Sequence, residues 1–288
     1  MPIDLLMLSR IAAPCALIIA ALLEVSPAAA ADPKCEPHSV ATKYPSLVGK
    51  TIKIGISAAD KPNSYRDPND PAKIVGFDAD YASAVFQCIG VPFEFSVGGW
   101  SGLMPALVSG QTDVMWDGLY YTPERAKSVD YVLYSSAGEA VVVAKGNPKS
   151  VHAISDLCGL KAVSQIGSTE IAMLQHESQN CLDAKKPEIG VVAAQDRPSG
   201  LRELETGRVD AYVGSGTVAI YDPALFEIAY SYNSGIKIGV GVHKGDQELE
   251  HAIHDAILIL QQNGTAKQLY ETYALPSSLS VPTEIVLQ

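Results

Sequence analysis

The sequence predicts an α/β fold made of two similar units, and three observations support this expectation. Apolar runs typical of strands occur at 51–56, 93–97 and 114–116. Segments with helical spacing of apolar residues lie between these runs, which predicts a largely parallel sheet. The third observation is a short internal repeat.

The repeat pairs LVSGQTDV at 107–114 with LETGRVDA at 204–211. Each copy follows Ser-Gly-Leu, at Ser101 and at Ser199. In both copies a helix is expected to end at glycine, and an aspartate leads into an apolar strand. Two similar α/β units that face each other are the simplest explanation.

The first unit opens with the alternating strand at 51–56, followed by a loop rich in Pro, Asn and Asp at 60–71. Asp78 is expected to cap the next helix, which ends at Gly90. The strand at 93–97 follows. A second helix then ends at Gly110 and leads into the buried strand at 114–116.

A helix start follows this strand and is the most informative part of the chain. Thr122 fits the N-cap position, and Pro123 fits the first helical position. α/β proteins bind ligands where a strand stops and a helix starts. Arg125 and the free amides there could together hold one carboxylate.

The second unit repeats this arrangement. A strand at 161–164 leads to a helix that Ser168 or Thr169 can cap. This helix start is a second candidate anion site on the opposite side of a cleft, with an ordinary capped helix as the alternative. Two helices close the chain, and residues from Pro276 onward are expected to form a surface tail.

Composition narrows the function. The chain has 288 residues and a formal net charge of -11, which argues against nucleic acid and anionic membranes as partners. Residues 1–31 read as a signal peptide with an alanine-rich cleavage site, and Met7 is an alternative start. We therefore expect an exported, periplasmic protein. We expect no metal and no cofactor, because His251 and His254 fit a solvated helix face better than a zinc site.

Four cysteines remain after the signal peptide: Cys35, Cys88, Cys158 and Cys181. In an oxidising compartment they predict two disulfides, for which three pairings exist. If the chain folds as two lobes, Cys35–Cys88 and Cys158–Cys181 each stay within one lobe.

Several motifs, in this order and spacing, resemble the extracellular solute-binding proteins of ABC importers, of the polar amino-acid type. The resemblance runs from about 51 to 275 and rests on these segments: VGFDAD at 75–80, WSGL at 100–103, GQTD at 110–113, TPER at 122–125, GST at 167–169 and NGT at 263–265.

The resemblance implies a two-lobed flytrap fold in which each lobe is a sheet flanked by helices and two strands form the hinge. Lobe 1 would hold 45–139 plus 236–288, and lobe 2 would hold 140–235. A small-molecule ligand would bind in the cleft, and the closed form would dock on a membrane permease. We expect a monomer.

The resemblance also assigns candidate contacts. Arg125 matches the arginine that clamps the ligand carboxylate, and Ser168 and Thr169 match the helix start that completes this site. Gly118 and Tyr120 fall where family members hold the ligand with backbone and small polar groups.

Two departures from the family pattern concern the rest of the ligand. The first loop reads Asp60-Lys-Pro-Asn and lacks the usual stacking aromatic, and Gly-Ser215-Gly stands where an aspartate usually binds the α-ammonium. Asp117 or Asp60 could replace that carboxylate, and Ser215 is a further candidate contact. Nearby aromatic residues could supply flat walls: Trp100, Trp116, Tyr120 and Tyr121.

The resemblance implies an amino acid or an amino-acid derivative as the ligand, and the two departures argue against a plain α-amino acid. They predict a ligand with a carboxylate, a cationic or hydroxylated part and some bulk, such as an opine, an ectoine-like compound or a sugar–amino-acid conjugate. Two alternatives stay open. One is a cleft enzyme similar to cyclohexadienyl dehydratases, although no partner marks Asp117 or Asp60 as an acid or base. The other is a ligand-sensing module for a membrane receptor.

Overall fold

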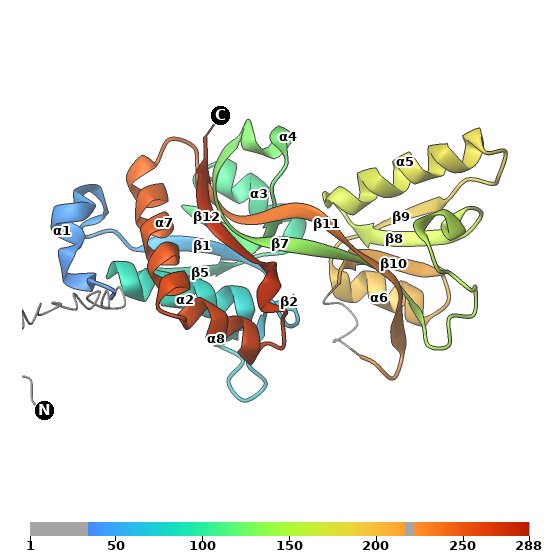
Figure 1. The fold of residues 1–288 in the computed structure, drawn as a ribbon, viewed down its shortest axis with the longest axis horizontal. Helices are drawn as coiled ribbons and strands as arrows, with labels where there is room; N and C mark the ends of the chain where they lie inside the picture. The colour runs from blue at the N-terminus through green and yellow to red at the C-terminus, as the bar shows by residue number, and fades with distance from the viewer. Residues whose placement is uncertain (1–33, 217–221, 288) are drawn as a thin grey trace, which may run out of the picture. The chain divides into compact units, whose positions relative to one another are not determined.

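The computed structural model describes residues 34–216 and 222–287, so the predicted signal peptide at 1–31 lies outside the described residues. Its main sheet runs β5-β1-β6-β11-β7-β10-β8-β9, and β12 pairs with β7 (Figure 1). Within the described part of the chain, no helix has the length and apolar character needed to span a membrane.

The first lobe contains three parallel strands, β1 (Ile52–Ile56), β5 (Phe93–Val97) and β6 (Val114–Tyr120). Its helices were largely expected from the sequence. They are α1 (Val40–Lys43), α2 (Phe77–Ile89), α3 (Trp100–Val108), the single turn α4 (Pro123–Ala126), α7 (Gln247–Gln262) and α8 (Thr265–Thr272).

The second lobe repeats the parallel arrangement with β8 (Lys161–Gln165), β9 (Gly190–Ala194) and β10 (Ala211–Ser215). Two helices, α5 (Thr169–Asp183) and α6 (Arg197–Glu205), cover its opposite faces (Figure 1). The two-lobed α/β fold expected from the sequence is therefore present.

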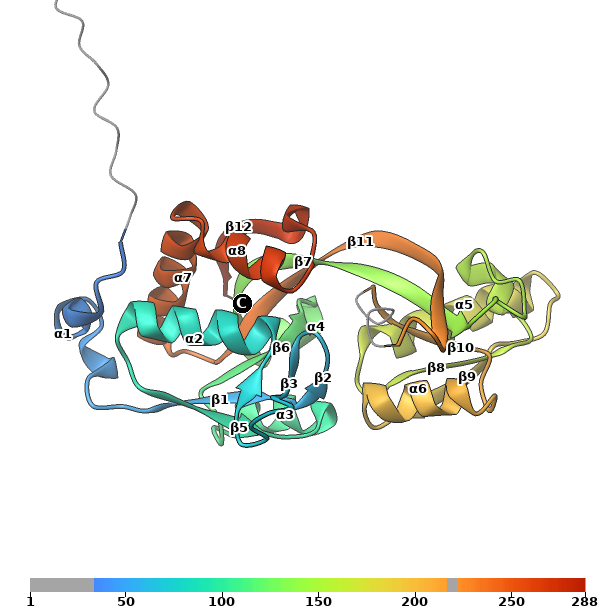
Figure 2. The same cartoon turned by 90° about the horizontal axis from the view of Figure 1, so that it is seen from below.

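Two long antiparallel strands, β7 (Val129–Ala144) and β11 (Phe226–His243), run through both lobes (Figure 2). β11 pairs with β6 in the first lobe, whereas β7 pairs with β10 in the second. Their mutual register shifts between Asn233 and Lys237. We propose that the lobes divide there, at the sequence boundaries 139/140 and 235/236.

Each lobe has its own hydrophobic core. Ile54, Tyr81 and Ile253 belong to a large cluster in the first lobe, whereas Leu201 and Tyr212 belong to a separate cluster in the second. The two cores are therefore separate from one another, and β7 and β11 connect the lobes that contain them.

The internal repeat has a structural cause. Asp113 accepts a hydrogen bond from the Lys53 amide at 2.7 Å and donates its own amide to the Lys53 carbonyl at 2.9 Å. Asp210 makes the same two bonds with Lys161, at 2.9 and 2.8 Å. In each lobe the repeated aspartate thus joins the start of one strand to its parallel neighbour.

Three expectations about local structure were wrong. The segment at 60–71 is not all loop, because β2 (Ala59–Asp60), β3 (Ser64–Arg66) and β4 (Ile74–Val75) form a small antiparallel sheet. Asp78 lies inside the first turn of α2, and Gly76 occupies the N-cap. The C-terminal residues form β12 (Ser280–Val286), because β7 offers them an edge for pairing.

Both disulfides lie within a lobe. Cys35 is bonded to Cys88, and Cys158 is bonded to Cys181. Of the three pairings left open by the sequence, this is the one in which neither disulfide ties the lobes together, so neither restricts their relative movement.

Candidate functional site

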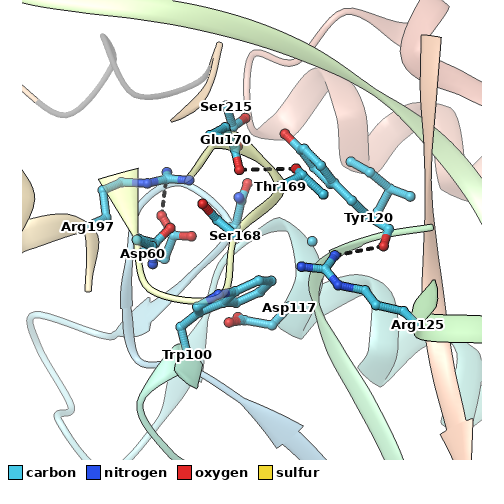
Figure 3. Close-up of a pocket in the computed structure, with 14 residues that line it drawn as sticks. Asp60, Trp100, Asp117, Tyr120, Arg125, Ser168, Thr169, Glu170, Arg197 and Ser215 are labelled. Atoms are coloured by element: carbon cyan, nitrogen blue, oxygen red, sulfur yellow. Dashed lines mark hydrogen bonds and ion pairs between the residues drawn. The ribbon is translucent and has the colours of Figure 1, made fainter. Parts of the chain in front are cut away.

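A pocket of about 490 Å³, including space open to solvent, lies between the two lobes (Figure 3). It lies next to β6 and the start of α5, the two places where the sequence predicted ligand contacts. Its lining residues are Asp60, Asn63, Trp100, Asp117, Gly118, Tyr120, Arg125, Gln165, Ser168, Thr169, Glu170, Arg197, Ser215 and Ile238.

Arg125 lies on one side of the pocket. The predicted N-cap positions it, because the Thr122 hydroxyl accepts a hydrogen bond from the Arg125 amide at 3.1 Å. The guanidinium donates to the Tyr120 carbonyl at 2.8 Å and to the Gly167 carbonyl of the other lobe at 2.9 Å. A guanidinium has five N–H donors, so three remain for an anion.

The start of α5 lies beside Arg125. Ser168 occupies its N-cap position, but its side chain does not cap the helix amides. Its hydroxyl instead lies 3.1 Å from the Ser164 hydroxyl. The first-turn amides of a 15-residue helix and the Arg125 guanidinium therefore meet at one place, which suits a carboxylate.

Carboxyl groups occupy another part of the pocket. Asp117 lies in the middle of β6 and is 5% exposed. It accepts hydrogen bonds from the Ser57 amide and hydroxyl and from the Ser64 hydroxyl, at 3.1, 3.0 and 2.7 Å. Burial and the nearby Asp60 carboxyl raise the pKa of Asp117 to about 7. Glu170 is also buried and lines the same pocket.

Asp60 and Arg197 form an ion pair that joins the lobes (Figure 3). The exposed fractions of their side chains are 15% and 5%, so the pair is largely shielded from water. Burial lowers the pKa of Arg197 and the Asp60 carboxylate raises it, with a net increase that keeps the guanidinium charged. Asp60 is therefore already neutralised across the cleft.

The structure places eight of the nine candidate contacts at the pocket. Gly118 has a left-handed backbone with φ +60°, a conformation that favours glycine. Trp116 is the exception, because its ring is fully buried in the first core and its indole N–H donates to the Tyr134 hydroxyl at 3.1 Å. Trp116 therefore does not contact the pocket, whereas Trp100 lines it.

Sequence reasoning missed two charged residues of the pocket, Glu170 and Arg197. Glu170 follows the predicted anion-binding hydroxyls directly, so its position was available as a signal. Arg197 follows the carboxyl end of β9, where α/β sheets place ligand-binding residues. Its link to Asp60 depends on how the lobes meet, which no local pattern predicts.

Comparison with known proteins gives a consistent result. Residues 52–276 match the family described as bacterial extracellular solute-binding proteins, family 3. The chain is 28% identical to the L-arginine-binding protein of Pseudomonas aeruginosa strain PAO1 over 240 residues, which cover 78% of this chain and 88% of that protein.

Two further relatives agree. The L-cystine-binding protein TcyJ of Escherichia coli strain K12 is 25% identical over 234 residues, covering 77% of this chain and 82% of TcyJ. A solved structure of an ancestral arginine-binding protein bound to arginine is 36% identical, with a TM-score of 0.69, and covers 77% of this chain and 97% of that one.

These relatives are named as binding proteins and not as enzymes, and the solved arginine-binding structure has the fold described above. The family match covers most of the chain, including both helix starts at the pocket. The chain therefore belongs to the bacterial extracellular solute-binding proteins of family 3 and binds a small solute.

Proposed function

We propose that this protein is an exported receptor that captures a small carboxylated polar ligand and delivers it to an ABC permease. In this proposal residues 1–31 direct export to the periplasm, and the mature protein acts as a monomer. Closure of the lobes around the ligand creates the surface that the permease recognises.

The distribution of charge in the pocket is the observation that carries this proposal. Arg125 and the start of α5 form an electropositive corner, and Asp117 and Glu170 lie in the same pocket. A ligand with both a carboxylate and a cationic group satisfies both parts at once. Asp117 and Glu170 also supply negative charge in place of the aspartate that the family usually has at the position of Ser215.

This chemistry fits amino acids and their derivatives, including opines and ectoine-like compounds. The relatives named for arginine and cystine support this class, because both ligands carry a carboxylate and an ammonium group. The Trp100 and Tyr120 rings line the pocket and can pack against the remaining part of the ligand.

Binding and closure are coupled in this proposal. The Arg125 guanidinium already contacts the other lobe through the Gly167 carbonyl, so a carboxylate held at this point touches both lobes. A ligand shifts the population toward the closed form only if that form gives it additional contacts. The corner formed by Arg125 and α5 provides such contacts.

A thermal-shift screen of mature protein, residues 32–288, tests the proposal. The panel contains the common amino acids, opines, ectoine-like osmolytes and polyamines. A ligand at one hundred times its Kd adds about 2.7 kcal/mol of stability, which is readily measured. We expect a carboxylated hit that Arg125→Ala abolishes and that Arg208→Ala, a change at a surface arginine, leaves intact. A polyamine hit unaffected by Arg125→Ala would refute the proposal.

A further inference from the structure

The C-terminal strand β12 lies outside the residues that match the family, which end at residue 276. It pairs with β7 in antiparallel orientation as far as Ser280, which lies opposite Ser135 (Figure 1). We call Leu279 and β12 together, residues 279–286, the C-terminal brace. Its position beside one of the two strands that connect the lobes indicates a role in their movement.

The brace is anchored to the first lobe at the end nearest the second lobe. The Leu279 carbonyl accepts hydrogen bonds from the Ser135 and Ser136 hydroxyls, each at 3.2 Å. The Ser135 hydroxyl also accepts a hydrogen bond from the Tyr270 hydroxyl of α8 at 2.8 Å. Both serines are buried, so water does not compete strongly for these bonds.

The rest of the brace is held along the first lobe. The Gln261 side chain of α7 donates a hydrogen bond to the Val281 carbonyl at 2.7 Å. Ile285 packs against the large core cluster of the first lobe, and Val286 packs against a neighbouring apolar cluster of the same lobe. The brace therefore joins β7 to α7 and α8, which makes this part of β7 a firm part of the first lobe.

Both edges of β7 change partner directly beyond the brace. On one edge, β12 pairs as far as Ser135 and β10 pairs from Glu139 onward. On the other edge, the register with β11 shifts between Ser136 and Gly138. Among the described residues, no strand partner lies opposite Ala137 on either edge. This short stretch is therefore the part of β7 that neighbouring strands support least.

A cavity borders the same stretch of β7. It measures about 1200 Å³, including space open to solvent, and its lining includes Ser136, Ala137 and Gly138. Leu279 of the brace lines it from the first lobe, and Tyr232 lines it from the second. Because side chains do not fill this space, β7 can bend here without forcing packed atoms together.

We propose that the C-terminal brace sets the pivot of lobe closure, because it holds β7 rigid with the first lobe up to Ser135 and confines bending to residues 136–138. This inference rests on the proposed function, since it concerns the closure that captures the ligand. Without the brace, one edge of β7 in the first lobe loses its partner, and bending can begin several residues earlier. The lobes of the ligand-free protein then sample a wider range of separations.

Pulsed electron paramagnetic resonance on the ligand-free mature protein measures this range. Spin labels are attached to cysteines introduced as Gln111→Cys in the first lobe and Gln175→Cys in the second, both at exposed positions. Deletion of residues 279–288 removes the brace, and deletion of 287–288 is the matched control because it leaves β12 intact. We expect the longer deletion to broaden the distance distribution about twofold and the control to leave it unchanged.

A milder variant decides the test if the longer deletion prevents folding. Ser135→Ala combined with Ser136→Ala removes both hydroxyl donors to the Leu279 carbonyl and keeps β12. It should broaden the distribution in the same direction by a smaller amount. Amide hydrogen exchange provides the structural control, because it should accelerate in residues 131–135 and stay unchanged in β10 of the second lobe.

The outcomes separate this inference from the proposed function. An unchanged distribution in the folded deletion variant overturns the inference, and so does an unchanged distribution in the double serine variant where the deletion does not fold. Faster exchange in residues 131–135 without broadening also overturns it, because β12 would then only stabilise the first lobe. No ligand enters these measurements, so the absence of a carboxylated hit in the thermal-shift screen would count against the proposed function alone.

Discussion

The ion pair between Arg197 and Asp60 is expected to stabilise the closed form, and Arg197→Met tests this expectation. Methionine retains an unbranched chain of similar bulk but removes the charge. Because Arg197 belongs to lobe 2 and Asp60 to lobe 1, the pair exists only when the lobes are close. In an open form this ion pair would be broken, so its removal should disfavour the closed form relative to the open one.

The expected magnitude follows from the burial of the pair. Removing one partner of a buried ion pair costs about 3–5 kcal/mol, because the other charge is left unpaired. The Asp60 side chain is 15% exposed, so we take the lower end of that range, about 3 kcal/mol. Since about 1.4 kcal/mol corresponds to a factor of ten, ligand affinity should fall roughly 100-fold.

Calorimetric titration measures the affinity, and small-angle X-ray scattering measures the separation of the lobes. Arg208→Met is the matched control, because Arg208 pairs with Glu203 at the surface of the same lobe with a side-chain exposure of 70%. Such exposed pairs contribute less than about 1 kcal/mol. Adding Asp60→Asn to Arg197→Met should recover part of the affinity, because no unpaired charge then remains.

The reasoning is refuted if Arg197→Met changes ligand affinity by less than about threefold. It is also refuted if Arg208→Met has the same effect as Arg197→Met. Either result would mean that the interlobe ion pair does not contribute to closure.

Three further predictions concern stability and detection. Two buried carboxyl groups have raised pKa values: that of Asp117 is about 7, and that of Glu139 in β7 is about 8. The native protein without ligand therefore holds more protons than the unfolded chain. The free energy of unfolding should therefore fall as pH rises from about 5 to 8, by up to about 1.4 kcal/mol per pH unit for each group. Denaturant titrations at several pH values measure this dependence, and Glu139→Gln should make it weaker. Ligand binding should change tryptophan fluorescence through Trp100, so Trp100→Phe should abolish the change and Trp116→Phe should retain it. Replacing both cysteines of the bond Cys158–Cys181 with serine should lower the unfolding free energy by about 3 kcal/mol, given the separation of 23 residues, and an unchanged chemical denaturation midpoint would contradict this.

The helix and strand order was predictable because it rests on local patterns. The N-cap at Thr122, the helix ends at Gly110 and Gly90, and the repeated aspartates all follow from backbone rules that act over a few residues. The edge strand β12 was not predictable, since it forms only where β7 leaves an edge to pair with.

Part of the pocket lining was predictable in the same way. Arg125 and the start of α5, which line the pocket, could be selected from the sequence because each belongs to a recognisable helix start. The Asp60–Arg197 pair was missed because its partners come from different lobes. Trp116 was assigned to the pocket but lies in the first-lobe core. The apolar pattern of a buried strand does not reveal which of its two faces packs into the core and which lines the pocket.

The central claim is that Arg125 and the start of α5 hold the carboxylate of the ligand, and a thermodynamic cycle tests it most directly. The cycle measures Kd for wild-type protein and Arg125→Ala, each with the best carboxylated ligand from the thermal-shift screen and with its carboxamide. Charge-assisted bonds of this kind contribute about 1.5–3 kcal/mol each, so we predict a coupling of at least about 2 kcal/mol between Arg125 and the ligand charge. A coupling near zero, with the carboxamide bound as tightly as the carboxylate, would contradict the account.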